Sequence, residues 1–267
     1  MVQRYFFQTK NRCVATAFQQ SQIRISFFLV AQSKTDLHIP DFINFAVMQI
    51  SPIHFSLFGL DLMEPMALIT NWMIASFCLF AAFKLKGSSD KTIRLFTVFY
   101  GCLAISTFFG GLGHVFFQYT GLYGKLPSWI FAILAGIFAG KAVLEVWGDR
   151  PGKKFLHNFL IVKSVVLLLL SIWTLKFIFV TLDAILTYLL YCGYMAWKLW
   201  KAEVTAMRFL VFGVLVSLPS AFIFLLKLNP HRYLNKDDLS HLLMLACVIF
   251  FYKGIDLLRK SVSTKSV

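Results

Sequence analysis

The stretch MALITNWMIASFCLFAAFKL, residues 66–85, contains a single charged residue, Lys84. About 20 consecutive apolar residues form a helix that is long enough to cross the hydrocarbon core of a bilayer. Six further stretches have the same character and are separated by short polar segments; they are residues 95–118, 128–147, 156–173, 177–197, 209–226 and 239–257. The sequence therefore predicts an all-α polytopic membrane protein, with a seven-transmembrane helix bundle in residues 63–267.

The composition of the whole chain agrees with this prediction. Hydrophobic residues make up 58% of the 267 residues and charged residues only 14%, whereas a soluble domain is about one quarter charged. The net charge of +14 would suggest nucleic acid in a soluble protein. In a membrane protein the same excess of Lys and Arg collects in cytoplasmic loops, so we expect no nucleic-acid partner.

The distribution of basic residues predicts the orientation in the membrane. Alternate loops are rich in Lys and Arg; the basic residues of these loops and the tail are Lys84, Lys86, Lys91, Arg94, Arg150, Lys153, Lys154, Lys198, Lys201, Arg208, Arg259, Lys260 and Lys265. By the positive-inside rule, the N-terminus is expected outside and the C-terminus in the cytoplasm. The sixth loop, which also contains basic residues, is the exception.

Residues 1–62 differ in composition from the rest of the chain. They mix Gln, Arg and aromatic residues, and Pro40 and Pro52 interrupt any helix. We expect an N-terminal arm that is either peripheral to the bundle or not part of the mature protein.

Ionisable side chains inside a membrane are costly, so each is a candidate functional residue. With the predicted topology, eight polar residues fall near the outer leaflet boundary. They are Glu64, Asn71, His114, Asp183, His231, Asp237, Asp238 and His241. Because they come from at least four elements and converge on one level, we place the functional site there.

Histidines and carboxylates on separate helices are the ligands that zinc or a similar divalent ion requires. We expect His114 and His241 to bind the metal, with His231 as the weakest candidate for a third ligand. Asp237 and Asp238 would be catalytic, or one of them would cap the last helix. Glu64, Asn71 and Asp183 would support the site or a second cation.

Other polar positions have structural interpretations. Lys141 and Glu145, one turn apart, are expected to neutralise each other, and Lys163 to extend toward the cytoplasmic surface. The glycines of the segment GGLGH, residues 110–114, are expected to let another helix approach closely.

Seven spans, the pair Glu64–Pro65 at the start of the first, GGLGH in the second and the Asp237-x-x-x-His241 spacing at the start of the last resemble the CREST superfamily. That group includes alkaline ceramidases and the progestin and adiponectin receptors. The resemblance implies a zinc held by histidines of the early and final spans, a calcium site at the acidic motif that matches Glu64, and hydrolysis of a membrane lipid amide or ester by metal-activated water.

The sequence also departs from the pattern of that superfamily. Gly110 stands where a serine precedes the early histidine, and Leu245 stands where a second histidine follows His241. These departures favour a non-enzymatic membrane sensor or receptor-like protein as the alternative to a hydrolase. A small transporter, with Asp183, Lys141 and Glu145 as a relay, is a third hypothesis, although the sequence shows no internal repeat of the kind that transporters use.

Overall fold

The computed structural model describes residues 53–226, 228–231 and 233–265. All of these residues belong to one compact unit, Asn44–Val267. The expectation for the N-terminal arm therefore lies outside the described residues over positions 1–52, and only its last residues can be compared with the structure.

Seven helices in the described part of the chain are long and apolar enough to cross a membrane. Six are continuous: α3 (Pro65–Leu85), α4 (Lys91–Val115), α6 (Leu126–Trp147), α7 (Lys153–Thr174), α10 (Arg208–Leu225) and α11 (Lys236–Lys265). The other consists of α8 (Ile178–Thr187), the π-helical segment η2 (Tyr188–Met195) and α9 (Ala196–Lys201). Each predicted span coincides with one of these helices, so the prediction of a seven-helix bundle is confirmed.

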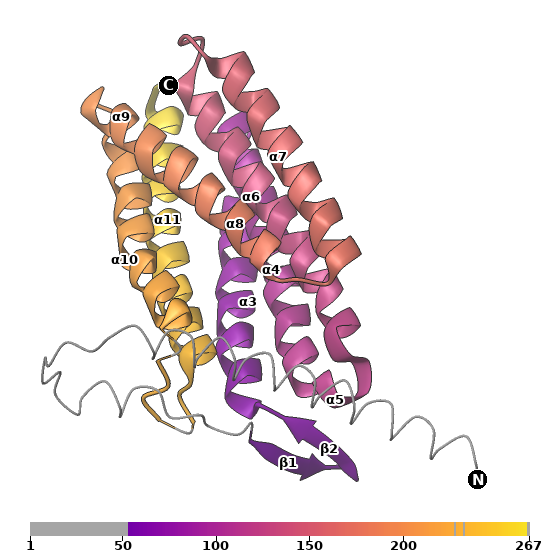
Figure 1. The fold of residues 1–267 in the computed structure, drawn as a ribbon. Helices are drawn as coiled ribbons and strands as arrows, with labels where there is room; N and C mark the ends of the chain where they lie inside the picture. Colours follow the sequence, from indigo (N-terminus) through magenta and orange to yellow (C-terminus); the bar gives the residue numbers. More distant parts are fainter. Residues whose placement is uncertain (1–52, 227, 232, 266–267) are drawn as a thin grey trace, which may run out of the picture. The chain divides into compact units, whose positions relative to one another are not determined.

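The helices run alternately up and down, as Figure 1 shows. The start of α3, the end of α4 and the starts of α6 and α11 therefore lie at the same end of the bundle. Two short elements, α5 (Phe117–Thr120) and the 3₁₀ helix η1 (Gly121–Lys125), connect α4 to α6 at this end, and η3 (Thr205–Met207) precedes α10.

A small β-hairpin lies at this same end and is an exception, in the described part of the chain, to the predicted all-α architecture. Strand β1 (His54–Leu57) pairs antiparallel with β2 (Leu60–Met63), with His54 opposite Met63. Phe58 and Gly59 form the turn with positive φ angles of 52° and 77°, which suits a two-residue hairpin loop. The backbone N–H of Glu64 donates to the carbonyl oxygen of Ile53 at 2.9 Å and closes the base of the hairpin.

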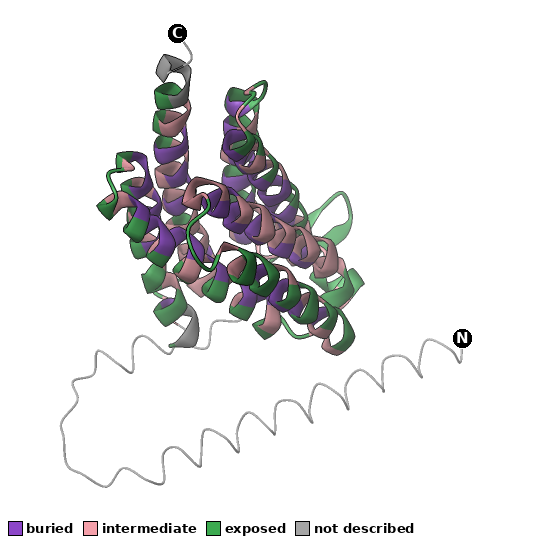
Figure 2. Ribbon diagram, turned by 90° about the horizontal axis from the view of Figure 1, so that it is seen from above, coloured by how far each residue is buried: buried purple, intermediate pink, exposed green. Residues whose placement is uncertain are grey.

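The interior of the bundle is apolar and aromatic. Phe96, Phe99, Tyr100 and Phe251 are completely buried, and the Tyr100 hydroxyl donates to the carbonyl oxygen of Val248 at 2.9 Å. Figure 2 shows buried faces turned toward neighbouring helices and exposed faces turned outward. Many of the outward residues are large and apolar, among them Phe83, Phe155 and Trp173, as expected for helices surrounded by hydrocarbon.

Glycines of the segment GGLGH allow α4 to approach its neighbours closely, as predicted. A Cβ atom on Gly110 would lie 3.1 Å from both Asn71 Oδ1 and Ser128 Oγ. A Cβ atom on Gly113 would lie 3.1 Å from the carbonyl oxygen of Gly124. Larger residues at these positions would push α3 and η1 away from α4.

Two predicted charge interactions are wrong. Glu145 pairs with Lys91 at 3.1 Å rather than with Lys141, which lies over the ring of Phe138. Lys163 does not extend to the surface: it is buried, because Asp183 on α8 accepts from its ammonium group at 2.5 Å. The carboxylate, together with the hydroxyl groups of Ser164 and Thr187, offsets part of the cost of removing the ammonium group from water.

Candidate functional site

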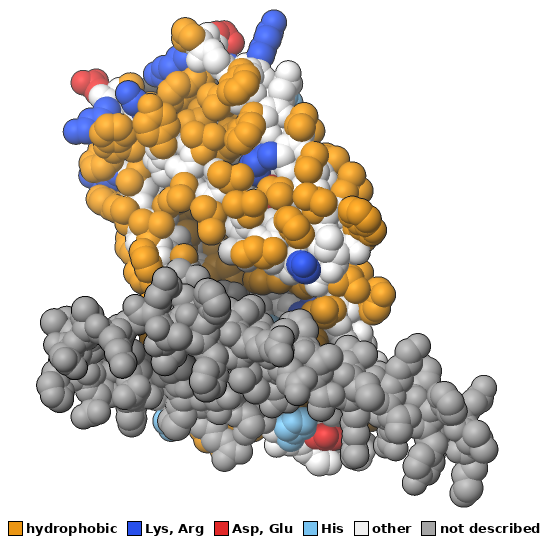
Figure 3. Space-filling model, in the orientation of Figure 1, with side chains coloured by type: hydrophobic (Ala, Val, Ile, Leu, Met, Phe, Trp, Pro, Cys, Tyr) orange, Lys and Arg blue, Asp and Glu red, His pale blue; other side chains and the backbone are white. Residues whose placement is uncertain are grey.

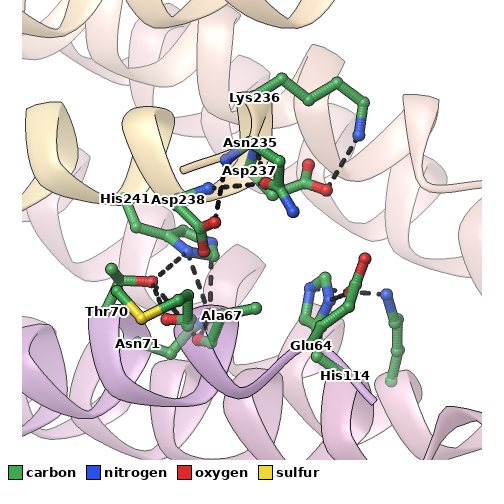
Figure 4. A network of polar contacts seen from close by, with 12 residues as sticks. Glu64, Ala67, Thr70, Asn71, His114, Asn235, Lys236, Asp237, Asp238 and His241 are labelled. Atoms are coloured by element: carbon green, nitrogen blue, oxygen red, sulfur yellow. Dashed lines mark hydrogen bonds and ion pairs between the residues drawn. The ribbon is translucent and has the colours of Figure 1, made fainter. Parts of the chain in front are cut away.

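Polar side chains from four elements meet at the hairpin end of the bundle, as Figure 4 shows for most of them. We call this group the histidine cluster, and its members are Glu64, Thr70, Asn71, His114, Lys125, Asp237, Asp238 and His241. The structure thus brings together six of the eight residues singled out in the sequence. Thr70 and Lys125 were missed, since a threonine and a loop lysine carry no distinctive signal.

Glu64 and His114 form the shortest contact in the histidine cluster. His114 Nδ1 lies 2.6 Å from Glu64 Oε2, and both side chains are mostly buried. Glu64 is the residue before Pro65, the first residue of α3, and its φ of 49° is rare for a residue with a side chain. Its carboxylate does not cap α3; this backbone conformation directs it to His114 instead. Non-glycine residues in such conformations cluster at functional sites.

The charge state of Glu64 follows from this contact. Burial by itself raises the pKa of a carboxyl group, but the hydrogen bond from His114 and the electrostatic interactions with His114 and Lys125 outweigh burial here. The pKa of Glu64 consequently lies below its ordinary value, and Glu64 is a carboxylate at neutral pH.

Lys125 contacts the other nitrogen of His114. Its Nζ lies 3.4 Å from His114 Nε2 and 5.2 Å from the centre of the Phe117 ring. Because an ammonium group only donates hydrogen bonds, Nε2 of His114 is the acceptor and Nδ1 carries the proton given to Glu64. Gly113 makes this possible, since a Cβ atom there would lie 3.0 Å from the Lys125 stem at Cγ.

His241, near the start of α11, is held by α3. Its Nδ1 lies 3.0 Å from Thr70 Oγ, and the Thr70 hydroxyl donates to the carbonyl oxygen of Met66 at 3.0 Å. The Thr70 oxygen therefore accepts from Nδ1–H of His241, which leaves the lone pair on Nε2. The Asn71 amide nitrogen donates to Ala67 O at 2.8 Å and lies 3.3 Å from His241 Nε2.

The start of α11 is capped by Asn235, and this cap includes Asp238. Asn235 Oδ1 accepts from the backbone N–H groups of Asp237 at 2.8 Å and Asp238 at 3.1 Å. Asp238 Oδ2 accepts in return from the backbone N–H of Asn235 at 3.0 Å, which is a capping box. The interpretation of one aspartate as part of the helix cap is confirmed for Asp238. Because this cap uses one carboxylate oxygen of Asp238, only the other oxygen can take a catalytic role.

The second oxygen of Asp238 is the open position in the histidine cluster. Asp238 is 1% exposed, and its Oδ1 has no hydrogen-bond partner among the described residues. A buried carboxylate oxygen without a donor is costly, and an ion or a water molecule bound there would explain it.

Asp237 is bound by Lys236 Nζ at 2.8 Å and interacts electrostatically with both His114 and His241.

His231 does not join the histidine cluster. It forms an isolated β-bridge with Leu234, its Nδ1 accepts from the backbone N–H of Tyr233 at 3.1 Å, and its side chain is exposed. The expectation of His231 as a third ligand is corrected, because the loop before α11 folds the imidazole onto its own backbone.

Asp183 also lies elsewhere, in a group that we call the Lys163 cluster: Lys163, Ser164, Asp183 and Thr187. Lys163 Nζ donates to Asp183 Oδ1 at 2.5 Å and to Thr187 Oγ at 2.6 Å, and Ser164 Oγ donates to the same carboxylate oxygen at 2.7 Å. The expectation that Asp183 supports the metal site is therefore corrected, since its partners are on α7 and α8.

The donor set of the histidine cluster suits a divalent ion, although the side chains are not yet arranged around one point. No group of three or more His, Cys, Asp or Glu side chains in the described residues lies ready to hold a metal. The ring centres of His114 and His241 are 6.2 Å apart. With a Zn–N bond of about 2.0 Å, two histidines on one tetrahedral zinc have ring centres about 5 Å apart. The two rings therefore lie farther apart than two ligands of one zinc ion.

The fold and the site define a helical bundle with seven membrane-length helices and a buried histidine–carboxylate cluster at one end. Residues 66–260 match the model of a family of unknown function, DUF6962. Since this match covers most of the chain, the protein belongs to that family. No curated protein and no solved structure matches the chain.

Proposed function

We propose that this protein is an integral membrane hydrolase that cleaves a lipid amide or ester with the help of a divalent metal, zinc in the first instance. The observation that carries the proposal is the contact of Glu64 Oε2 with His114 Nδ1 at 2.6 Å, together with the distance of 6.2 Å between the ring centres of His114 and His241. A histidine that donates one ring N–H to a carboxylate is the usual arrangement of a metal-binding histidine.

The charge distribution supports a membrane location with the histidine cluster on the outer side. Figure 3 shows hydrophobic side chains along the bundle and several Lys and Arg side chains at the end opposite the hairpin, with a few others along its length. By the positive-inside rule, that end faces the cytoplasm. The histidine cluster then lies at the outer boundary of the bilayer, at the depth where a lipid carries its amide or ester linkage.

In this proposal each residue of the histidine cluster has a distinct task. His114 and His241 would bind the ion through their Nε2 atoms, while Glu64 and Thr70 hold the two Nδ1–H groups and so fix both tautomers. Asp238 Oδ1 is the carboxylate oxygen available to the ion. We assign Glu64 to His114 and not to a second cation such as calcium.

A divalent ion in such a site would supply Lewis acidity, which would polarise the scissile carbonyl group and make water a better nucleophile. Asp237 would accept the proton of an attacking water, because it interacts electrostatically with both histidines.

Elemental analysis of the purified protein tests the metal. We expect about one transition-metal ion per chain, lost in a His114→Ala/His241→Ala double variant because both nitrogen ligands are removed. The matched control is His54→Ala/His157→Ala, which removes two exposed histidines and should retain the metal. Turnover of ceramides, phospholipids and lysolipids should be lost with the metal. Metal that persists in the first double variant would contradict the assignment.

Lys125 provides a second prediction. Its ammonium group lies against the nitrogen of His114 that the ion needs, so ion and ammonium compete. Lys125→Met should therefore bind Zn²⁺ or Co²⁺ more tightly than the natural protein, by about tenfold for each 1.4 kcal/mol of repulsion relieved. Isothermal titration measures this.

The control for Lys125→Met is Lys236→Met, which removes a positive charge at the same end but contacts Asp237 instead of a histidine. An equal gain in both variants would mean that only the general charge matters. Affinity that falls in Lys125→Met would overturn the competition.

The same contact supports the alternative function, a membrane sensor without catalysis. In this alternative Lys125 stays on His114 and the histidine cluster works without a metal. Neither Lys125→Met nor Lys236→Met then changes the metal content. A metal that binds without turnover of any lipid would also favour the sensor over the hydrolase.

A further inference from the structure

The tip of the β-hairpin exposes three apolar side chains. Phe58 is 95% exposed, and its neighbours Leu57 and Leu60 are 48% and 44% exposed. Isolated exposed apolar residues are common on proteins, but a consecutive group at the end of a projecting element marks a contact surface.

The turn itself does not require an aromatic residue. Both central residues have positive φ, a conformation that favours Asn and Gly and disfavours a bulky residue such as phenylalanine. Phe58 therefore gains nothing from the turn geometry and buries almost none of its ring. Since neither local conformation nor packing against the described residues explains this residue, we look for the explanation in its surroundings beyond the described residues.

The hairpin is held firmly enough to present this tip in one place. The backbone N–H of Asp61 donates to the Tyr119 hydroxyl at 3.1 Å, and the Gln118 amide donates to the carbonyl oxygen of Asp61. Leu62 is buried and fixes the second strand to the bundle. The strand then leads through Met63 directly to Glu64 of the histidine cluster.

The neighbouring elements are suited to the same surroundings. Tyr119 on α5 and Tyr123 on η1 are 56% and 69% exposed, and Leu122 between them is 40% exposed. Figure 1 shows the hairpin lying across the end of the bundle beside α5, rather than continuing along the helix axes. Aromatic residues at the ends of membrane-length helices lie at the boundary between lipid headgroups and hydrocarbon.

We infer that the hairpin tip, Leu57 to Leu60, inserts into the headgroup–acyl boundary of the bilayer and anchors the histidine cluster at that depth. This inference rests on the membrane location proposed above, but not on the hydrolase activity. The occupant of the apolar tip is lipid, because membrane-length helices end beside the hairpin and the neighbouring elements α5 and η1 also expose aromatic residues.

Environment-sensitive fluorescence of the full-length protein in phosphatidylcholine nanodiscs tests the inference. A Cys13→Ser variant keeps only the four buried native cysteines; Phe58→Cys is then labelled with the fluorophore NBD. We expect blue-shifted emission, quenching by lipids with a doxyl group near the headgroup, and protection from aqueous iodide. A label on Asp149→Cys, in an exposed loop at the opposite end, should be quenched by iodide.

Each other outcome overturns the inference in a recognisable way. Iodide quenching at position 58 equal to that at 149 places the tip in water. Protection from both iodide and doxyl lipid means that protein covers the tip. A label on Met73→Cys, an exposed position near the middle of α3, should be quenched by doxyl groups deep in the acyl chains; failure there contradicts the membrane location itself.

A second variant separates anchoring from folding. Phe58→Asn improves the fit of the turn, so the bundle should remain folded and thermally stable. With the label moved to Leu60→Cys, the same substitution should reduce doxyl quenching and increase iodide quenching. Unchanged quenching in the folded Phe58→Asn protein would show that Phe58 is not the anchor.

Discussion

Asp183→Asn is expected to destabilise the bundle by about 3–5 kcal/mol, because it leaves the buried ammonium of Lys163 without its counter-charge. Lys163 is 8% exposed and Asp183 1% exposed, so neither group can recover its hydration without unfolding of α7 or α8. Lys163→Met should cost a similar amount, since it strands the carboxylate in the same apolar surroundings. The double variant Lys163→Met/Asp183→Asn removes both charges and should recover most of the loss.

Unfolding of the four proteins in mixed micelles, monitored by circular dichroism, measures this cycle. The control is the pair Lys91–Glu145, whose side chains are 64% and 30% exposed. Because solvent screens exposed ion pairs, Lys91→Met/Glu145→Gln should change the free energy of unfolding by less than about 1 kcal/mol. Losses that simply add in the double variant of Lys163 and Asp183 would show that the two charges do not depend on each other.

The Lys163 cluster also bears on the transporter hypothesis. The relay that it required, with Lys141 and Glu145 beside Asp183, does not form, since Glu145 pairs with Lys91 and Asp183 with Lys163. Thr187, the last residue before the π-helical segment η2, accepts from Lys163. The buried pair thus lies next to the point at which the helical geometry of this span changes.

Glu64→Gln is expected to weaken metal binding by about 10–100-fold, the usual effect of losing a carboxylate behind a metal-binding histidine. A glutamine side chain retains an acceptor for Nδ1–H of His114 but lacks the negative charge that increases the basicity of the ring. Titration of the metal-free protein with Co²⁺, followed by its visible absorption, measures the affinity.

Asp61→Asn is the matched control, because Asp61 is an acidic residue of the same end that pairs with the exposed His54. Its metal affinity should equal that of the natural protein. Since the pKa of Glu64 lies below its ordinary value, its contribution is fully present at neutral pH and is lost only in acid, as the pH falls through that lowered pKa. Equal affinities of Glu64→Gln and the natural protein near neutral pH would separate Glu64 from the metal site.

The histidine cluster shows which features of the site could be predicted from the sequence and which could not. The level of each polar residue along its helix was predictable, since span boundaries and the rise per residue fix depth. Contacts between Glu64 and His114, or between Thr70 and His241, depend on how each helix is rotated about its axis. Apolar residues on all sides of a membrane helix leave no amphipathic pattern from which this rotation can be inferred.

The sequence by itself therefore determined the seven helices and the end of the bundle at which the histidines meet. The physical reason is that a bilayer core demands long apolar segments and excludes unpaired charges. Only the tertiary structure decided which groups interact: Asp183 pairs with Lys163, Asp238 accepts from Asn235, and His231 contacts the backbone of its own loop. It also showed that the end of the predicted N-terminal arm forms a β-hairpin. These depend on side-chain contacts between distant or irregular segments, which local sequence patterns do not specify.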